Sequence, residues 1–297
     1  AQGLRNRRTK LIGIIAEDIA QFSTPVIMEG IMEYFEEMDY RAMIENLRLY
    51  ARWSDSWYDD EKAYRSVLEP ALQELLSIKV DGMIYIAGHA RTLRNFPNET
   101  SLPSVMVYAY TDSARVPSVV IDDEQGAYDT TKYLISMGHR DIAVLAGRAD
   151  NIHTQKRLNG YQRALFESRI LYNPGWIFYG DWNKESGYRL ADKLYRTGAT
   201  ALFCMSDHMP GGLYDYFYEK GIRVGEDISI TGFDNQEMAE YLSPGLPTME
   251  LNLHRIGHEA ARILLDRLAL EDGEGAEKET ELYIPCNFIE RKSVKRI

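Results

Sequence analysis

The sequence of 297 residues has little that would cross-link it, anchor it in a membrane or keep it unfolded. It holds only two cysteines, Cys204 and Cys286. Their number rules out a disulfide framework and their spacing suits no zinc site, so buried thiols in a reducing cytoplasm are expected. No apolar run approaches the roughly 20 residues of a membrane helix, and the N-terminus lacks the apolar core of a secretion signal. Only 10 prolines, 45% hydrophobic and 27% charged residues indicate a globular protein.

Motifs of the common enzyme classes are also missing. There is no G-x-G-x-x-G dinucleotide turn, no G-x-x-x-x-G-K-[ST] phosphate loop and no G-x-S-x-G nucleophile elbow. His254 and His258 stand four residues apart on a predicted helix, but no third ligand lies nearby. We therefore expect them to be surface or dimer-face histidines. The sequence predicts no catalysis, no cofactor and no metal site.

Charge is unevenly distributed along the chain. The formal net charge is −11, from 34 basic and 45 acidic residues. Four of the basic residues and no acidic one fall within residues 1–10. The other 30 basic residues thus stand against all 45 acidic ones, a net charge of −15. Because neutralising phosphates supplies most of the general affinity for DNA, this acidic body is not expected to bind nucleic acid by itself.

Strand-like and helix-like segments alternate along the sequence. Apolar runs typical of buried parallel strands fall at residues 10–16, 40–46, 80–87, 103–108 and 118–121, and again at 141–146, 176–179, 199–205 and 228–232. A long helix near 253–268 and a last strand at 282–289 follow. This alternation predicts parallel sheets with helices on both faces. The length and the two series, which meet near Gly138, predict two similar lobes.

Five stretches match motifs that one protein family carries in this order. They are residues 80–84 (VDGMI), 137–147 (MGHRDIAVLAG), 157–161 (RLNGY), 201–207 (ALFCMSD) and 224–234 (VGEDISITGFD). Together they resemble the sugar-sensing core of the LacI/GalR family of bacterial transcription regulators, over nearly the whole chain. A single motif of this kind is a weak signal, whereas five in the right spacing are a strong one.

The N-terminus carries a sixth match. Residues 1–13 (AQGLRNRRTKLIG) resemble the end of the family's hinge helix and its basic link to the core. On this resemblance, Leu4 stands in the place of the leucine that enters the DNA minor groove. The helix-turn-helix headpiece that precedes the hinge is absent from the sequence. We therefore expect a cytoplasmic effector-binding and dimerisation core whose operator DNA is bound through that absent headpiece.

The resemblance implies an α/β fold of two Rossmann-like lobes with parallel sheets, joined by three crossovers, as in type I periplasmic binding proteins. A small ligand is then expected in the cleft between the lobes, at the carboxyl ends of the strands. The expected divisions are a hinge remnant and basic linker at 1–10, an N-terminal lobe at 11–137 and 252–280, a C-terminal lobe at 138–249 and 281–291, and a basic tail at 292–297.

Three residues of the second lobe have the chemistry that a sugar requires. Arg157, near a helix start, can donate to two adjacent hydroxyls, and Asp234, after an apolar strand, can accept from two. Trp182 follows a strand where the family places its stacking aromatic ring. A helix-surface ion pair, a helix cap and a core tryptophan are the respective alternatives. Alanine at Arg157 or Asp234 is expected to abolish sugar binding and to leave the fold intact.

Four more residues complete the predicted effector site. Asp18 and Gln21 follow the first strand, where the family contributes polar contacts, although turn formation alone is an alternative. Ser23 and Thr24 stand where many members have aromatic residues, and Ser206 stands where they have asparagine. The effector is thus expected to be a sugar or a sugar-like molecule of open identity.

The second stacking surface of the family is either absent from this chain or comes from elsewhere. Trp53 and Trp57 are candidates, in an aromatic-rich connection at residues 50–58 that is longer than a strand–helix loop needs. An exposed aromatic loop or a dimer contact is the alternative.

The implied mechanism is allosteric, in a homodimer. Effector contacts from both lobes favour a closed state, and closure changes the affinity for operator DNA, most simply as a repressor. Two other classes remain open from the residues. A periplasmic sugar-binding protein of a transporter shares the fold, and an α/β enzyme acting on sugars would reveal itself by turnover.

Overall fold

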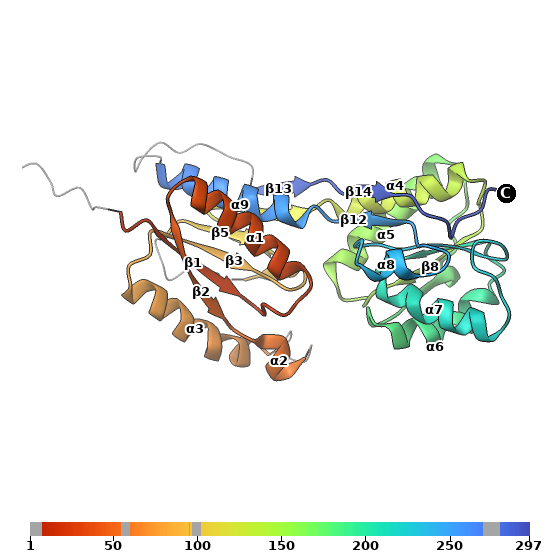
Figure 1. Ribbon diagram of the computed structural model, residues 1–297, viewed down its shortest axis with the longest axis horizontal. Coiled ribbons are helices and arrows are strands. Elements are labelled where there is room, and N and C mark those ends of the chain that lie inside the picture. Colours follow the sequence, from red (N-terminus) through yellow and green to blue (C-terminus); the bar gives the residue numbers. More distant parts are fainter. Residues whose placement is uncertain (1–7, 55–59, 95, 97–101, 270–279) are drawn as a thin grey trace, which may run out of the picture. The chain divides into compact units, whose positions relative to one another are not determined.

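The computed structural model describes residues 8–54, 60–94, 96, 102–269 and 280–297. The chain forms two compact units, coloured along the sequence in Figure 1. Unit 1 comprises residues up to Ile121 and Leu253–Ile284, and unit 2 comprises Asp122–Asn252 and Pro285–Ile297. The chain therefore passes three times from one unit to the other. Leu4 and Trp57 lie outside the described residues.

Unit 1 is built on a sheet of six parallel strands in the order β13-β7-β5-β3-β1-β2. The strands are β1 (Leu11–Ala16), β2 (Arg41–Asn46), β3 (Gly82–Ile86), β5 (Ser104–Val107), β7 (Ser118–Ile121) and β13 (Glu281–Ile284). Ile14 of the second-to-last strand in this order pairs with Ile44 on one side and Ile84 on the other. A small parallel pair, β4 (Thr92–Leu93) and β6 (Tyr110–Thr111), lies beside it.

Helices cover both faces of this sheet, as buried parallel strands require. Helices α1 (Ser23–Glu37) and α9 (Leu253–Ala269) pack together on one face, and α3 (Glu61–Ser77) covers the other, with the short α2 (Leu49–Trp53) after β2. The α3 face forms a core cluster in which Leu68 and Leu75 meet Ile15 and Met83. Asp60 caps α3, because its side chain accepts a hydrogen bond from the Ala63 amide at 2.9 Å.

Unit 2 repeats the design with a smaller parallel sheet in the order β11-β10-β8-β9. Its strands are β8 (Ile142–Ala146), β9 (Ile177–Tyr179), β10 (Ala201–Cys204) and β11 (Ser229–Thr231). Helices α4 (Asp123–Ser136) and α5 (Ile152–Glu167) pair with each other, as do α6 (Lys184–Tyr195) and α7 (His208–Glu219). A 3-10 turn (Pro174–Trp176), the short α8 (Met238–Tyr241) and the antiparallel pair β12 (Thr248–Glu250) and β14 (Asn287–Ile289) complete the unit.

The described end of the predicted linker is fixed to unit 1. The Asp81 carboxylate accepts hydrogen bonds from the backbone amides of Thr9 and Lys10, at 2.9 and 2.8 Å, and from the Thr9 hydroxyl at 3.0 Å. Lys10 also forms an ion pair with Asp39. The aspartate of the VDGMI motif therefore holds the basic segment at the amino ends of β1 and β3.

The predicted α/β class with parallel sheets is confirmed, but the division of the chain differs from the expected one. The first passage falls after Ile121 rather than after residue 137, so α4 belongs to unit 2. The reason is close packing between α4 and α5. A side chain at Gly160 would place its Cβ 2.0 Å from the Glu124 carbonyl oxygen, and this contact joins α4 to the second sheet.

The single last strand expected at 282–289 is two strands. β13 pairs with β7 in unit 1, whereas β14 pairs with β12 in unit 2, so residues 281–284 do not belong to the second lobe as predicted. Pro285 separates the two strands, because proline has no amide to continue a ladder. Cys286 follows at this break and is partly exposed rather than buried, while Cys204 is buried in β10.

None of the described helices is both long enough and apolar enough to span a lipid bilayer.

Candidate functional site

Arg157 lies on α5 and is the largest fully buried side chain at the carboxyl edge of the unit 2 sheet. Its Nε donates to Asp123 Oδ1 at 2.7 Å. The other oxygen of Asp123 lies 2.6 Å from His153 Nδ1. Asp123 begins α4 directly after β7, and His153 stands one turn before Arg157. The arginine is therefore held in place by a buried carboxylate that is itself shared with a histidine.

The same guanidinium contacts the predicted acidic residue. Arg157 Nη1 donates to the Met205 carbonyl oxygen and lies 3.5 Å from Asp234 Oδ1. Its plane also lies over the Phe233 ring, with 3.8 Å between Cζ and the ring centroid. Arg157 and Asp234 thus lie together, as a shared role requires, although the arginine is embedded in protein contacts rather than presented as an open fork.

Asp234 is held in a strained backbone conformation. Its φ is 111°, and Asn235 follows with a φ of 50°. The Asp234 amide donates to the Met249 carbonyl oxygen at 2.8 Å, which ties the turn to β12. Such strain is retained where the surroundings fix it, and it is concentrated at functional sites. The strained turn is consistent with a carboxylate that is placed for binding.

The Asp207 side chain holds this turn in place by hydrogen bonds. Its two carboxylate oxygens accept hydrogen bonds from the Thr248 hydroxyl at 2.7 Å and from the Gln236 amide at 2.8 Å. It approaches so closely that a Cβ at Gly232 would lie 2.1 Å from Asp207 Oδ1. The last residue of the motif ALFCMSD therefore positions the last residue of the motif VGEDISITGFD.

Burial and mutual repulsion set the charges of these carboxyl groups. Burial raises the pKa of Asp234 to about 7, although Arg157 opposes the rise. Burial and the nearby Asp234 raise the pKa of Asp207 well above its usual range. Burial also opposes ionisation of Asp123, but His153 and Arg157 outweigh it and keep the pKa of Asp123 below its usual value. The connected side chains thus comprise three carboxyl groups, one guanidinium and one imidazole.

Trp182 and Ser206 lie at the same edge of unit 2. Trp182 has a φ of 64° in the loop after β9, and its ring lies 5.9 Å from the Arg157 guanidinium. It packs so closely on the end of β8 that a Cβ at Gly147 would meet ring atom Cζ2 at 2.0 Å. The Ser206 hydroxyl accepts from the Met209 amide at 3.4 Å, at the start of α7.

Two buried polar atoms at this edge lack partners among the described residues. They are Trp182 Nε1 and the hydroxyl of Thr154, which lies on α5 beside His153. Buried donors are nearly always hydrogen-bonded in native proteins. The tryptophan nitrogen and the threonine hydroxyl thus have unused hydrogen-bonding capacity next to Arg157.

The predicted residues of unit 1 lie at the carboxyl edge of their own sheet, after β1. Asp18 is buried, and its two oxygens accept from the amides of Ala20 at 3.0 Å and Ala51 at 3.1 Å. Gln21 is half-buried beside Gly88. Ser23 is fully buried in the first turn of α1, and its hydroxyl has no partner among the described residues. Trp53 packs against the core cluster under α3.

Sequence reasoning missed three residues that hold Arg157 and Asp234 in place: Asp123, His153 and Asp207. One signal was available for Asp123, because the pair Asp122–Asp123 directly follows the buried strand β7, and carboxylates at that position lie at the ligand edge of a parallel sheet. His153 lies on α5 with Arg157, but its contact with Asp123 joins residues 30 apart in the chain.

Metal binding finds no support in the described part of the chain, where no three histidine, cysteine or acidic side chains are grouped as ligands. His254 Nε2 lies 3.1 Å from a Glu33 carboxylate oxygen, and the His258 ring packs edge-on against Tyr34.

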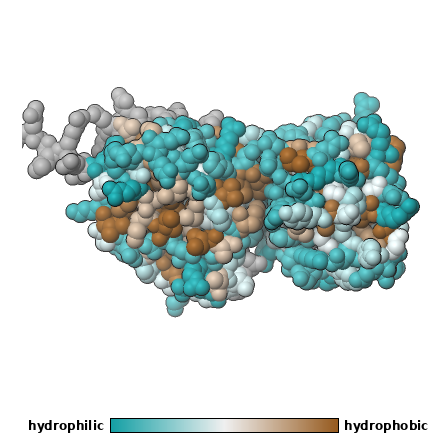
Figure 2. Space-filling model, in the orientation of Figure 1, coloured by the Kyte–Doolittle hydropathy of each residue, from teal (hydrophilic) through white to brown (hydrophobic). Residues whose placement is uncertain are grey.

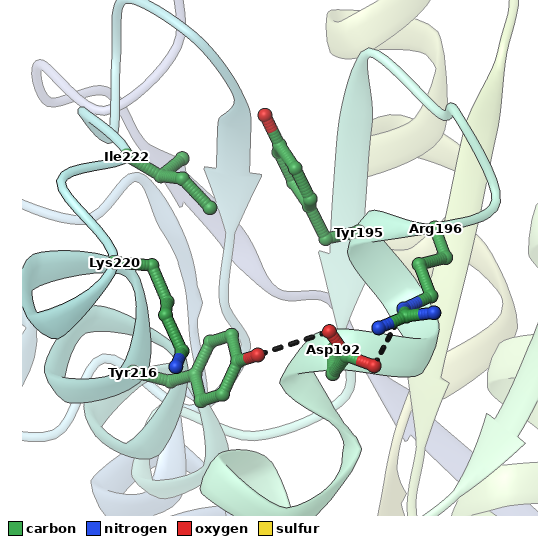
Figure 3. A pocket seen from close by; sticks show the side chains of 6 residues that line it. All are labelled: Asp192, Tyr195, Arg196, Tyr216, Lys220 and Ile222. Atoms are coloured by element: carbon green, nitrogen blue, oxygen red, sulfur yellow. Dashed lines mark hydrogen bonds and ion pairs between the residues drawn. The ribbon is translucent and has the colours of Figure 1, made fainter.

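A pocket of about 500 Å³ lies elsewhere on unit 2, at the ends of α6 and α7 (Figure 3). Asp192 joins its two sides, because one oxygen accepts from the Tyr216 hydroxyl at 3.0 Å and the other pairs with Arg196 at 2.7 Å. These helix ends lead into the amino ends of β10 and β11. The pocket therefore lies at the opposite edge of the sheet from Arg157 and Asp234. Its lining consists of Asp192, Tyr195, Arg196, Tyr216, Lys220 and Ile222.

Two Rossmann-like units with parallel sheets and three chain passages define the fold of type I periplasmic binding proteins. In agreement, the sequence pattern of the periplasmic binding protein-like domain matches residues 131–294. The HTH-type transcriptional repressor PurR of Aliivibrio fischeri is 30% identical over 280 residues, which cover 92% of this chain and 79% of that protein.

Solved structures agree with this match. The transcription regulator CcpA of Lactococcus lactis is 27% identical, with a TM-score of 0.76 over 97% of this chain and 100% of that one. A transcriptional regulator CelR in complex with cellobiose is 25% identical, with a TM-score of 0.76 over 97% of this chain and 85% of that one.

The chain belongs to the LacI family of transcriptional regulators. It is a ligand-responsive repressor whose effector-binding core has the periplasmic binding protein-like fold.

Proposed function

We propose that the effector is a sugar or sugar-like polyol, and that its primary contact is the Asp234 carboxylate at the carboxyl edge of unit 2. The observation that carries the proposal is the position of Asp234. This residue lies on a strained turn, and its carboxylate is 3.5 Å from the buried guanidinium of Arg157. Vicinal hydroxyls are donors, and a carboxylate that is oriented by one guanidinium can accept from two of them.

Other predicted residues take supporting roles in this proposal. Trp182 supplies an aromatic face, and its buried Nε1 supplies a free donor for a ligand oxygen. Ser206 stands beside Met205, whose carbonyl oxygen orients Arg157. Gln21, which follows β1 at the carboxyl edge of the unit 1 sheet, supplies a polar contact in this proposal. The complex of CelR with cellobiose supports a carbohydrate for a relative of this fold.

The repressor acts, in this proposal, as a cytoplasmic homodimer on operator DNA, and the effector changes its affinity for the operator. A differential affinity of roughly 1–3 kcal/mol between two states would change operator binding about 5- to 150-fold. The protein binds its sugar without converting it. Chemical turnover of a sugar by the purified protein would contradict this part of the proposal.

Exposed apolar side chains on α1, in the loop before it and on β2 support the dimer. Figure 2 shows hydrophobic residues on the visible face of the unit that holds these elements. Ile19, Phe22, Val26 and Ile44 are each between 38% and 44% exposed. Exposed apolar residues that gather on one face commonly mark an interface. Sedimentation velocity should therefore show a dimer that dissociates in the double variant Val26→Asp/Ile44→Asp. The control Leu171→Asp, at an exposed residue of unit 2, should remain dimeric, and a double variant that also remains dimeric would contradict the assignment.

A thermal-shift screen tests the effector class. The panel contains D-glucose, D-galactose, D-ribose, D-xylose, cellobiose and maltose, each over a concentration series. A sugar at 100 times its Kd adds about 2.7 kcal/mol of stability, which raises the melting temperature by several degrees. At least one sugar should stabilise the wild type and fail to stabilise Asp234→Asn. If no sugar stabilises the wild type, or if Asp234→Asn responds equally, the proposal is wrong.

A further inference from the structure

Helices α6 and α7 are in backbone contact near their first turns and carry large side chains at their last turns. A Cβ at Gly187 would lie 2.0 Å from the Met209 carbonyl oxygen, so the contact requires glycine. At the other ends, Tyr195 is the last residue of α6 and Tyr216 lies in the last turn of α7. The pocket of about 500 Å³ lies at these last turns (Figure 3). It is therefore lined by residues of unit 2 alone.

Contacts within unit 2 hold the apolar walls of the pocket in place. The Tyr195 ring packs against the buried Phe217 ring, with centroids 5.8 Å apart. The Tyr216 ring meets the Tyr188 ring edge to face, with centroids 5.5 Å apart. The Ile222 amide donates to the Phe217 carbonyl oxygen at 2.9 Å, which fixes the segment after α7 to the end of that helix. The shape of the pocket is thus set by packing within the protein.

The lining of this pocket contains one carboxylate and two cations. Both oxygens of the carboxylate, Asp192, are engaged, one by the Tyr216 hydroxyl at 3.0 Å and the other by Arg196 at 2.7 Å. The Arg196 side chain is nevertheless 77% exposed, so a ligand can reach its guanidinium. A ligand in the pocket therefore meets an excess of positive charge.

Lys220 supplies this excess charge. Its Nζ lies over the Tyr216 ring, 5.5 Å from the centroid. Glu219, which precedes it, accepts instead from the Tyr188 hydroxyl at 2.6 Å. Within the described part of the chain, no carboxylate forms an ion pair with Lys220, and the Tyr195 hydroxyl has no hydrogen-bond partner. The groups that remain for a ligand are thus an ammonium, a phenol hydroxyl and aromatic ring faces.

We propose that this pocket is a second ligand site, separate from the effector site, and that it binds a planar aromatic carboxylate. Tyr195 and Arg196 come from the end of α6, and Lys220 and Ile222 come from the end of α7 and the segment after it (Figure 3). The ring of the ligand packs against Tyr195 and Ile222. Its carboxylate accepts charge-assisted hydrogen bonds from Lys220 and Arg196. The pocket combines apolar walls with a few polar groups, as small-molecule sites do.

The same groups disfavour other classes of ligand. Sugar hydroxyls need acceptors as well as donors, and the carboxylate oxygens of Asp192 are already engaged. An organic cation would lie beside Lys220 and Arg196 and be repelled by them. An aliphatic anion would pair with these cations but would leave the Tyr195 ring uncovered. An aromatic carboxylate satisfies both the cations and the ring.

The test uses three soluble fluorinated probes, titrated by ¹⁹F nuclear magnetic resonance at neutral pH. The wild type should bind 4-fluorobenzoate with a Kd of about 1–10 mM, as a ligand of this size does. The neutral 4-fluorobenzamide, which keeps the ring, and trifluoroacetate, which keeps the carboxylate, should each bind at least fivefold more weakly. If the wild type does not bind 4-fluorobenzoate, or binds either of the other probes equally well, the proposed ligand class is wrong.

Variants locate the bound 4-fluorobenzoate. Lys220→Gln should weaken its binding at least fivefold, and Tyr195→Ala at least threefold. Lys220 is exposed, so its variant should keep the far-ultraviolet circular dichroism of the wild type. The matched control Lys193→Gln removes the same charge from an exposed residue of α6 outside the lining, and it should bind within twofold of the wild type. Wild-type affinity in Lys220→Gln, or an equal loss in Lys193→Gln, would overturn the inference.

Asp234→Asn distinguishes this pocket from the proposed effector site. Asp234 lies at the opposite edge of the unit 2 sheet, so Asp234→Asn should bind 4-fluorobenzoate within twofold of the wild type. A loss as large as that in Lys220→Gln would place the probe at the effector site and overturn the inference. The result is independent of the sugar panel, because a failure of every sugar contradicts the proposed function and leaves the aromatic carboxylate site unaffected.

Discussion

The carboxyl edges of the two sheets both contain a buried arginine–carboxylate pair, but their charges balance differently. In unit 1, Glu17 faces Arg91 one to one, and its remaining capacity is taken by Tyr85 and the Gly88 amide. In unit 2, Arg157 is connected to Asp123 and Asp234, and Asp207 lies directly behind. In the first network one carboxylate balances one guanidinium, whereas the second network has more carboxyl groups than guanidinium groups.

This difference assigns the two edges different tasks. The unit 1 network fixes the loop after β3, because Glu17 accepts hydrogen bonds from the Gly88 amide and from Arg91. The unit 2 network holds Asp234 on a strained turn, where the proposed function has its carboxylate accept hydrogen bonds from ligand hydroxyls. Excess buried carboxylate is unfavourable in the empty protein. In the proposed function, a ligand that supplies hydroxyl donors offsets this cost.

The largest expected effect on stability is the difference between the alanine variants of Arg157 and Arg91. Arg157→Ala should lower the free energy of unfolding by about 3–5 kcal/mol, because it leaves buried carboxylates without their cation. Arg91→Ala should cost about 1–3 kcal/mol, because Glu17 keeps the donors of Tyr85 and Gly88. Urea unfolding followed by circular dichroism measures both. The sequence alone suggested an intact fold for Arg157→Ala, and the burial of the pair changes that expectation.

Arg163→Ala is the matched control on α5. Arg163 forms an ion pair with Glu124 at 3.0 Å, and its side chain is 38% exposed. An exposed pair of this kind contributes up to about 1 kcal/mol. Equal losses for Arg157→Ala and Arg163→Ala would show that the buried network does not hold unit 2 together.

Two glycines provide the next comparison, because each follows a strand and lies under an aromatic ring. A Cβ at Gly147 would lie 2.0 Å from the Trp182 ring, and one at Gly88 would lie 2.8 Å from the Tyr50 ring. Overpacking costs about 1–3 kcal/mol. Gly147→Ala should therefore lower the free energy of unfolding more than Gly88→Ala, measured by the same urea titration. The reverse order would mean that Trp182 moves aside more easily than Tyr50.

A smaller effect concerns pH. An acid whose pKa is higher in the folded than in the unfolded protein takes up a proton on folding between the two values. The pKa of Asp234 is raised from 3.8 to about 7. Its contribution to stability is thus greatest below pH 4 and is lost as the pH rises through 7. Between pH 6 and pH 8 the melting temperature should fall, and it should fall less in Asp234→Asn.

The pH dependence of the melting temperature also distinguishes the carboxylates of the two units. Scanning fluorimetry at matched ionic strength should give the wild-type slope for Glu17→Gln, because that residue belongs to the hydrogen-bond network of unit 1 and not to that of Asp234. Equal slopes in the wild type and Asp234→Asn would contradict the assignment of the proton to Asp234.

The sequence was sufficient for the architecture, because buried strands and helical stripes follow from local patterns of apolar residues. It was not sufficient for the limits of the units. The apolar stripe of α4 has the same pattern whichever sheet it covers, and only its contact with Gly160 places it in unit 2. Similarly, the apolar residues on both sides of Pro285 read as one strand, although the two halves pair in different sheets.

Parts of the candidate site were predictable for a similar reason. Arg157, Asp234 and Trp182 each follow a local motif, and the structure brings them together. The partners of Arg157 come from contacts between residues that are far apart in the chain, which no local pattern contains.

The most direct test of the account is calorimetric titration, at pH 8, of the panel sugar that stabilises the protein most. The wild type should bind this sugar measurably, and Asp234→Asn should bind it about 100-fold or more weakly, since two charge-assisted hydrogen bonds contribute roughly 1.5–3 kcal/mol each. Equal affinity of the wild type and Asp234→Asn for that sugar would contradict it.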